Sequence, residues 1–350
     1  MKIFIWQIHI IKKLTATFLF FLFCLFGVYI LVDLSAHGVR FLSKSDIRDV
    51  FVYYFYSTST LLDLFLTLGF LLSTMRILHD LNSNREILAL QMTGLSKRKL
   101  LTPFFYFATF LSILAYANTE WLSPDAQDNV STFKLAHKTK KHKSDDPHIY
   151  TVSLDDESEL IYQHFNRKKN ELFDVFWVRN PSDIWHMKTL NIHSLKGSYV
   201  NHLVRKNKKF DSEMSYIEKK FTDLPWKDER LLNKVAPFEF RPISTLLAQA
   251  FITDTSEKRI IFSHLFYKLL VPLMPFLVIF AVSPPTLSYS RNFPYFLVVA
   301  YSIFGFVSLK VVLDGMLILG ENQVLPSYLA IFAPILFTLA CALPKYVRMQ

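Results

Sequence analysis

Residues 14–32 read LTATFLFFLFCLFGVYILV, an apolar stretch without a single charged residue. A helix rises by about 1.5 Å per residue, so a run of this length crosses a hydrocarbon core of about 30 Å. Five more long apolar runs follow, at residues 51–78, 101–118, 262–283, 293–317 and 325–343. Because a lipid interior offers the backbone no water to bond, each run is predicted to form a spanning helix.

The six runs are divided three and three around a charged middle segment. This layout predicts an α-helical membrane protein with six transmembrane helices and an inserted all-β domain. We expect an N-terminal transmembrane half at residues 1–118, the insert at 119–260 and a C-terminal half at 261–350. The first run is longer than the apolar region of a signal peptide, so we expect it to remain as a helix.

The insert contains stretches in which apolar and polar residues alternate, a pattern that is typical of half-buried strands. These stretches are residues 148–154, 159–165, 172–178, 189–195 and 198–204. Turn signals separate them, for example Asn180-Pro181-Ser182. Several short strands at this spacing predict an antiparallel sandwich or a jelly-roll-like sheet. Residues 243–257 are less strand-like and are predicted to form a short helix.

The formal net charge of +10 is placed mainly beside the apolar runs, which favours a lipid or a lipid-like anion over nucleic acid as the partner. Basic residues of short loops mark the cytoplasmic side of a membrane protein. Six crossings place one group of them together, namely Lys2, Lys12, Lys13, Arg76, Arg85, Lys97, Arg98, Lys99, Arg291, Lys345 and Arg348. Both termini are therefore predicted to be cytoplasmic, with the insert on the opposite face.

Sequence patterns of the common catalytic sites are absent. The chain has no G-x-x-x-x-G-K-[ST] phosphate loop, no H-E-x-x-H, no G-x-S-x-G and no cysteine pair at metal spacing. We therefore predict no catalytic residues, no bound cofactor and no metal site. If the protein does work, the energy is expected to come from a partner.

The loop between the second and third runs, residues 82–95, reads NSNREILALQMTGL. Ser83 and Glu86 have the spacing of a capping box, which begins a helix, and Gly94 is placed to end it. A short helix at about residues 83–95 is predicted. Its apolar residues need a surface to bury against; they are Ile87, Leu88, Leu90 and Met92. Glu86 is either a helix cap or an anchor for a partner.

This loop resembles the coupling-helix region of the lipopolysaccharide export permeases, the LptF/LptG or YjgP/YjgQ family. The acidic residue, the small residue and the glycine of that region correspond to Glu86, Ala89 and Gly94. The three-plus-three arrangement and the prolines of residues 283–285 and 325–326 are similar too. The segment 304–314, with Phe304-Gly305-Phe306, Lys310 and Asp314, is more similar to the G-type than to the F-type member.

The resemblance implies a non-catalytic permease subunit in the bacterial inner membrane, with a periplasmic jelly-roll domain. It implies a heterodimer with a paralogous permease and a cytoplasmic ABC ATPase dimer that uses ATP and Mg. Lipopolysaccharide would enter between the first and fifth helices and pass to periplasmic bridge proteins of jelly-roll type, toward the outer membrane. The ATPase would contact the coupling helix at Glu86, Ala89, Leu90, Met92 and Gly94.

A substrate with anionic sugar-phosphate heads needs cations at the outer interface. Arg40 and Lys44 follow the first run, and Lys134 follows the third. These residues and Lys310 are candidates for contact with the head group. A solvated basic surface is the alternative.

Ionisable groups inside a membrane helix need partners. Asp63, Lys268, Lys310 and Asp314 all lie within the apolar runs. Lys310 and Asp314 are four residues apart, so they share a helix face and can pair. We favour an internal ion pair, with contact between Lys310 and a substrate phosphate as the alternative.

Two other functions stay open. Another ABC-coupled lipid or lipoprotein permease is one, although such permeases commonly have four spanning helices with the large domain after the first. A membrane-anchored periplasmic assembly scaffold is the other, although a scaffold has no need for an apolar capped helix in the cytoplasm.

Overall fold

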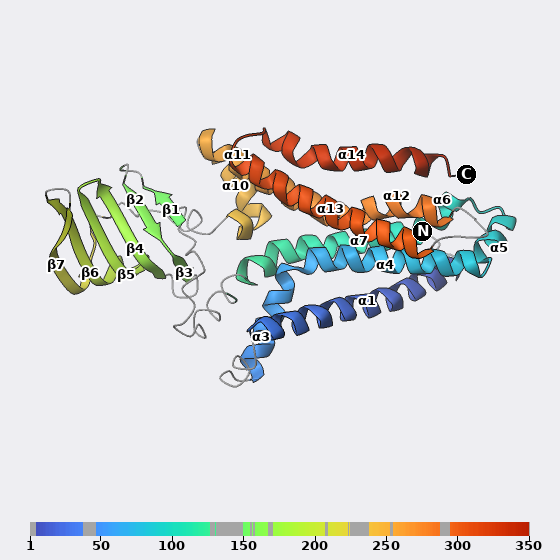
Figure 1. Cartoon of the computed structure of the whole chain (residues 1–350), viewed down its shortest axis with the longest axis horizontal. Helices are drawn as coiled ribbons and strands as arrows, with labels where there is room; N and C mark the ends of the chain where they lie inside the picture. Colours follow the sequence, from blue (N-terminus) through green and yellow to red (C-terminus); the bar gives the residue numbers. More distant parts are fainter. Residues whose placement is uncertain are drawn as a thin grey trace. The chain divides into compact units, whose positions relative to one another are not determined.

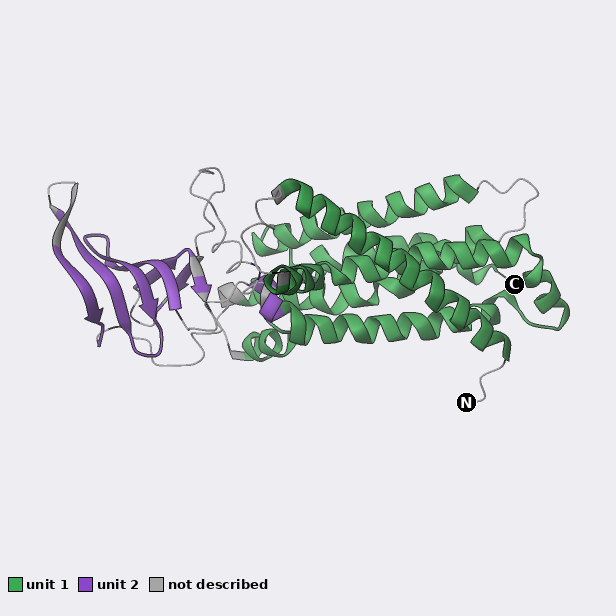
Figure 2. Cartoon of the chain, turned by 90° about the horizontal axis from the view of Figure 1, so that it is seen from below, with its two compact units in different colours: residues 1–123, 242–350 green, residues 124–241 purple. Residues whose placement is uncertain are grey.

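The computed structural model describes residues 5–37, 47–126, 130, 150–154, 156, 158–166, 171–206, 209–222, 224, 238–252, 255–287 and 295–349. The chain divides into two compact units (Figure 2). The helical unit consists of Met1–Ser123 and Pro242–Gln350, and the β unit consists of Pro124–Arg241.

Six helical segments of the described residues are long and apolar enough to cross a membrane, which confirms the predicted fold class. They are Ile5–Ala36, Leu62–Ser83, Lys97–Ala126, Lys258–Leu287, Tyr295–Glu321 and Ser327–Val347. The α-helices of this unit are labelled in Figure 1. Their bounds are α1 (Ile5–His37), α3 (Ile47–Thr60), α4 (Leu62–Ser83), α5 (Glu86–Met92), α6 (Lys97–Leu100), α7 (Thr102–Ala117), α10 (Ile243–Ile252), α11 (Thr255–Leu270), α12 (Met274–Leu287), α13 (Tyr295–Glu321) and α14 (Ser327–Val347). The unit also contains the short segments η1 (Asn118–Leu122) and η3 (Val271–Leu273).

The second apolar run is not one continuous helix. It is interrupted at Leu61, so that α3 and α4 are separate and the candidate span is Leu62–Ser83. The residues before the break are Ser57-Thr58-Ser59-Thr60. Thr58 and Thr60 donate from their hydroxyls to backbone carbonyls three or four residues earlier. Such bonds compete with the regular helix pattern and often bend helices, which explains the interruption.

The core of the helical unit is built around α4. Twelve of its 22 residues are buried, including Phe70, Met75 and Leu78. Aromatic contacts join it to its neighbours: Phe18 of α1 meets Phe107 of α7 edge to face at 5.3 Å, and Phe107 stacks on Phe70 at 5.9 Å. The outer helices instead leave large apolar side chains exposed, as expected for surfaces that face lipid tails.

The start of α1 and the end of α14 lie at the same end of the helical unit as α5 and α6 (Figure 1). The contacts agree with this placement, because Lys13 of α1 pairs with Glu86 of α5 at 3.5 Å. Near the other terminus, Arg98 of α6 donates to the backbone oxygen of Met349 at 3.0 Å. At this end of the helical unit, α1 therefore contacts α5, and α6 contacts the residues that follow α14.

The β unit contains one antiparallel sheet of seven strands in the described residues. The strand order is β1-β2-β4-β5-β6-β7, and the short β3 also pairs with β4. The bounds are β1 (Tyr150–Ser153), β2 (Glu159–Tyr162), β3 (His164–Asn166), β4 (Glu171–Asn180), β5 (Asp183–Asn191), β6 (Lys196–Lys206) and β7 (Lys209–Lys220).

One face of this sheet is buried around Trp177, with Tyr162, Val175 and Met187 beside it. Trp177 donates from Nε1 to Ser158 Oγ at 3.0 Å, and Ser158 Oγ donates to Asp156 Oδ1 at 2.5 Å. The hydrogen bond from Ser158 stabilises the ionised carboxylate and holds the pKa of Asp156 below its usual value.

Two details of the predicted strands are wrong. The expected strand at 189–195 is displaced, because β5 begins at Asp183 and residues 192–195 form the turn into β6. The strand β7 (Lys209–Lys220) was not predicted, because its charged residues hide the alternation. Charges of this kind are typical of strands at the edge of a sheet, where β7 lies. The predicted helix after the insert is present as α10 (Ile243–Ile252).

Candidate functional site

The short helix α5 (Glu86–Met92) lies in the loop where a helix was predicted, but its start differs from the prediction. Ser83 is the last residue of α4, and the residue that precedes α5 is Arg85, with a left-handed φ of 59°. No side chain caps this end of the helix. The predicted capping box is therefore wrong, because the backbone of Ser83 already belongs to the preceding helix.

The C-terminal end of α5 is closed by Gly94. Its φ is +86°, a conformation that glycine adopts without a steric cost. The Gly94 N–H donates to Gln91 O at 2.9 Å, and the Leu95 N–H donates to Leu90 O at 3.3 Å. This pair of bonds is a Schellman motif, which satisfies two carbonyls at the helix end. The turn after α5 is thus held by specific backbone bonds.

The two faces of α5 have different surroundings. Ile87 is buried, and Leu90 packs against the core of the helical unit. Ala89 is exposed, and Met92 is 91% exposed. Glu86 lies at the start of the helix, where its carboxylate pairs with Lys13. The helix is therefore anchored to the helical unit by Ile87, Leu90 and the Glu86–Lys13 pair, and it presents a small apolar surface at Ala89 and Met92.

A second group of functional candidates lies between α11 and α13. Lys310 Nζ lies 3.0 Å from Asp314 Oδ1 on the same helix face. Tyr267 of α11 completes the group, because its hydroxyl accepts a hydrogen bond from Lys310 and donates one to Asp314. The Lys310 ammonium also lies 4.6 Å from the centre of the Tyr267 ring. The three side chains join the two helices through polar contacts.

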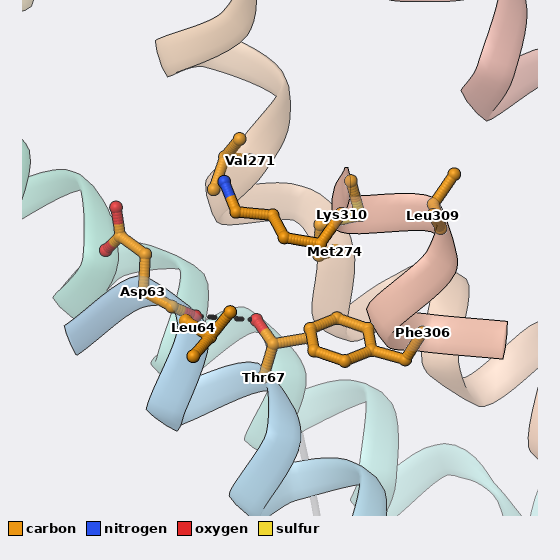
Figure 3. A pocket seen from close by; sticks show the side chains of 8 residues that line it. All are labelled: Asp63, Leu64, Thr67, Val271, Met274, Phe306, Leu309 and Lys310. Atoms are coloured by element: carbon orange, nitrogen blue, oxygen red, sulfur yellow. Dashed lines mark hydrogen bonds between the residues drawn. The ribbon is translucent and has the colours of Figure 1, made fainter. Parts of the chain in front are cut away.

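A small cavity adjoins this group (Figure 3). Its walls come from α4, η3, α12 and α13, and they include Asp63, Thr67, Val271 and Lys310. Figure 3 shows the Lys310 side chain extending across the cavity toward the side lined by Asp63. Of the four predicted intramembrane charges, three therefore surround one region. The fourth, Lys268, is buried on α11 next to Tyr267, within electrostatic range of Asp63.

Several polar partners were not found from the sequence. Tyr267 is one, since a tyrosine in an apolar run carries no signal of an ion-pair role. Another is Asn118 at the start of η1, which accepts from Ser59 Oγ at 2.7 Å and donates to Ser59 O at 3.0 Å. A third is the buried His264 of α11, whose Nε2 lies 2.9 Å from Glu321 Oε1 at the end of α13. The positions of Asn118 and His264 at the ends of apolar runs were the available hint.

The predicted head-group residues Arg40, Lys44 and Lys134 lie outside the described residues. Lys310 is described, and its ammonium is directed to Tyr267 and Asp314 within the helical unit. Among the described side chains, no group of three or more His, Cys, Asp or Glu residues has the arrangement of a metal site.

The family model described as lipopolysaccharide export system permease LptF/LptG matches residues 8–346, nearly the whole chain. The match does not distinguish the G-type from the F-type member, so the expected G-type character stays untested. A comparison with curated proteins finds no match.

Proposed function

The chain belongs to the LptF/LptG family of lipopolysaccharide export permeases, and from that premise we propose that it is the membrane subunit of an ATP-driven exporter. A multi-pass inner-membrane location follows from the family and the six apolar helices. The proposed work of the chain is to take lipopolysaccharide out of the inner membrane. The observation that carries this proposal is the position of α5, a short helix that Ile87 anchors to the bundle and that leaves Met92 exposed.

The proposed contact with the ATPase is made by α5. An exposed apolar residue beside an acidic one suits a partner surface with an apolar pocket and a basic rim. Glu86, Ala89 and Met92 supply this surface, while Leu90 and Gly94 fix the shape of the helix and its turn. ATP and Mg would be bound by the partner, and this chain would contribute the connection to the spanning helices through Lys13 and Ile87.

We also propose that both termini and α5 face the cytoplasm and that the β unit is periplasmic. The support is the basic residues near α5 and the single span, Lys97–Ala126, that separates α5 from the insert. The sheet has an edge strand, β7, whose backbone groups can pair with a strand of another protein. Such pairing is the proposed route to the bridge proteins and, in the same direction, to the outer membrane.

For the substrate, the proposed head-group contacts are Arg40, Lys44 and Lys134, which flank the outer ends of the first and third apolar runs. The proposed role of Lys310 is different, because its ammonium is already engaged by Tyr267 and Asp314. We assign it to the internal ion pair with Asp314, which Tyr267 connects to α11 through hydrogen bonds.

Co-purification with the cognate ATPase tests the coupling role of α5. Glu86→Lys reverses the charge at the helix start and is expected to weaken recovery of the ATPase by more than about 1 kcal/mol, or roughly fivefold. Asp49→Lys is the matched control, since Asp49 is an exposed acid on α3, far along the chain from α5. Unchanged recovery of the ATPase with Glu86→Lys would exclude the proposed contact. A scaffold protein would retain no ATPase with either variant.

A further inference from the structure

The cavity beside Lys310 is small, and three polar residues, Asp63, Thr67 and Lys310, are among those that line it. The volume of the cavity that is open to a water-sized sphere is about 10 Å³, which is close to what one water molecule needs. Apolar side chains, among them Val271, Phe306 and Leu309, form the remaining walls. The cavity therefore has room for a single small polar molecule and for little else.

The carboxylate of Asp63 borders this cavity with an unsatisfied atom. Its Oδ1 is buried and has no hydrogen-bond partner among the described residues. A buried polar atom of this kind is costly unless something bonds to it. Asp63 and Lys310 are both described, and they form no direct ion pair with each other. A small molecule between the two side chains would satisfy Asp63 Oδ1.

The hydrogen-bonding capacity of Lys310 points to the same space. A lysine ammonium has three N–H donors. Two of them are directed to Tyr267 Oη and Asp314 Oδ1. The third has no partner among the described residues, and the side chain extends across the cavity in Figure 3. The cavity thus faces one free donor and one free acceptor.

A third polar atom completes the set. Thr67 also lines the cavity, and its hydroxyl donates to the backbone oxygen of Asp63 at 2.9 Å. Its proton is used in that bond, so its lone pairs remain able to accept. A molecule in the cavity would then need to accept one hydrogen bond and donate two. Water has this capacity, whereas a metal cation would be repelled by the Lys310 charge.

We propose that the cavity binds one water molecule, which accepts from Lys310 Nζ and donates to Asp63 Oδ1 and Thr67 Oγ1. Buried waters typically make about three hydrogen bonds to groups that would otherwise be unsatisfied. This water connects α4 to α13, two helices that have no direct ion pair at this level. All groups that would contact this water belong to the helical unit.

A density map of the full chain in lipid nanodiscs, at a resolution that shows ordered water, tests the site directly. We expect one density peak within hydrogen-bond distance of Lys310 Nζ, Asp63 Oδ1 and Thr67 Oγ1. Direct contact between the Asp63 carboxylate and the Lys310 ammonium would overturn the proposal.

A change of cavity volume gives a second test, whose sign distinguishes a wet from a dry cavity. Val271→Ile adds one carbon at the cavity wall and would displace the water, so it is expected to lower the melting temperature by about 2 °C. In the charge-free background Asp63→Leu with Lys310→Met, the same substitution meets no water. There it is expected to leave the melting temperature unchanged or to raise it.

Val282→Ile is the matched control for this pair of measurements. Val282 is a buried residue of α12 that does not line the cavity, so overpacking should lower the melting temperature equally in both backgrounds. A rise in melting temperature for Val271→Ile in the otherwise natural chain would show a dry cavity and would overturn the proposal.

Discussion

Helices α4 and α13 both span the helical unit, but they are attached in different ways. α4 has twelve buried residues among 22, and α13 has four among 27, namely Phe306, Leu309, Leu313 and Gly320. The other large side chains of α13 are mostly exposed. What holds α13 is a set of polar contacts: Lys310 and Asp314 with Tyr267, and Glu321 with His264.

The difference follows from the solvent. Lipid tails are as apolar as a leucine side chain, so an exposed apolar helix in a bilayer gains little by burial. Packing and polar contacts must then decide which helices stay together. A helix that is held by few apolar contacts and several polar ones can be detached from its neighbours by a change in charge. A helix that is packed like α4 cannot. We expect the two helices to respond oppositely to apolar and polar substitutions.

The largest expected effect is on apolar packing. Phe70 of α4 is fully buried, and Phe70→Ala is expected to lower the free energy of unfolding by about 3–5 kcal/mol because it leaves a cavity. Phe304 of α13 is 71% exposed, and Phe304→Ala is expected to change this free energy by no more than about 0.5 kcal/mol. Detergent-denaturation titrations of both variants provide the measurement. Equal losses of unfolding free energy in the two variants would contradict the difference between α4 and α13.

The next effect concerns a close contact between α13 and α11 at Gly320. A Cβ at Gly320 would lie 2.7 Å from Ser263 Oγ, whereas a Cβ at Gly305 would meet nothing within 4 Å. Gly320→Ala is therefore expected to cost about 1–3 kcal/mol of unfolding free energy, and Gly305→Ala should cost nothing. Adding Ser263→Ala should restore part of the loss, since it removes the clashing oxygen. A lack of rescue would locate the strain elsewhere.

A change in the charge of α13 tests whether its polar contacts matter for transport. Lys310→Ala removes the cation that Tyr267 and Asp314 share, and it is expected to slow lipopolysaccharide release in reconstituted vesicles. Lys310→Arg keeps a cation with several donors and is expected to slow release less. The two release rates are compared at equal ATPase activity. Indistinguishable rates would remove the proposed role of the polar attachment.

The smallest effect is expected in the β unit, which serves as a reference outside both helices. The Ser158 hydrogen bond lowers the pKa of Asp156, so this bond adds stability above the ordinary aspartate pKa and loses it as the pH falls through the lowered value. Asp156→Asn should therefore be slightly less stable than the natural chain at neutral pH, and the difference should vanish in acid. Amide exchange of β2 and β4, compared between the two chains at each pH, measures it. A difference that persists in acid would exclude the ionised carboxylate as the cause.

Features that depend on neighbouring residues could be predicted from the sequence, whereas features that depend on more distant parts of the structure could not. Spanning helices depend on about 20 consecutive apolar residues, so each is visible locally. The turn at Gly94 is likewise local, since it needs only a residue that tolerates positive φ. The capping role of Ser83 failed because the end of the preceding helix decided it. The strand β7 was missed because its exposed edge position permits charges that mask the alternation.

Hydrophobic length, alternation and turn residues act on neighbouring positions, so the six apolar helices, the β insert and the short helix α5 can be predicted from the amino-acid sequence. The partners of the polar side chains follow from the folded chain: Lys13 pairs with Glu86, Tyr267 bonds to Lys310, and Asp63 and Lys310 line one cavity. These pairs come from segments far apart in the chain. Their meeting depends on how the helices pack, which no local pattern encodes.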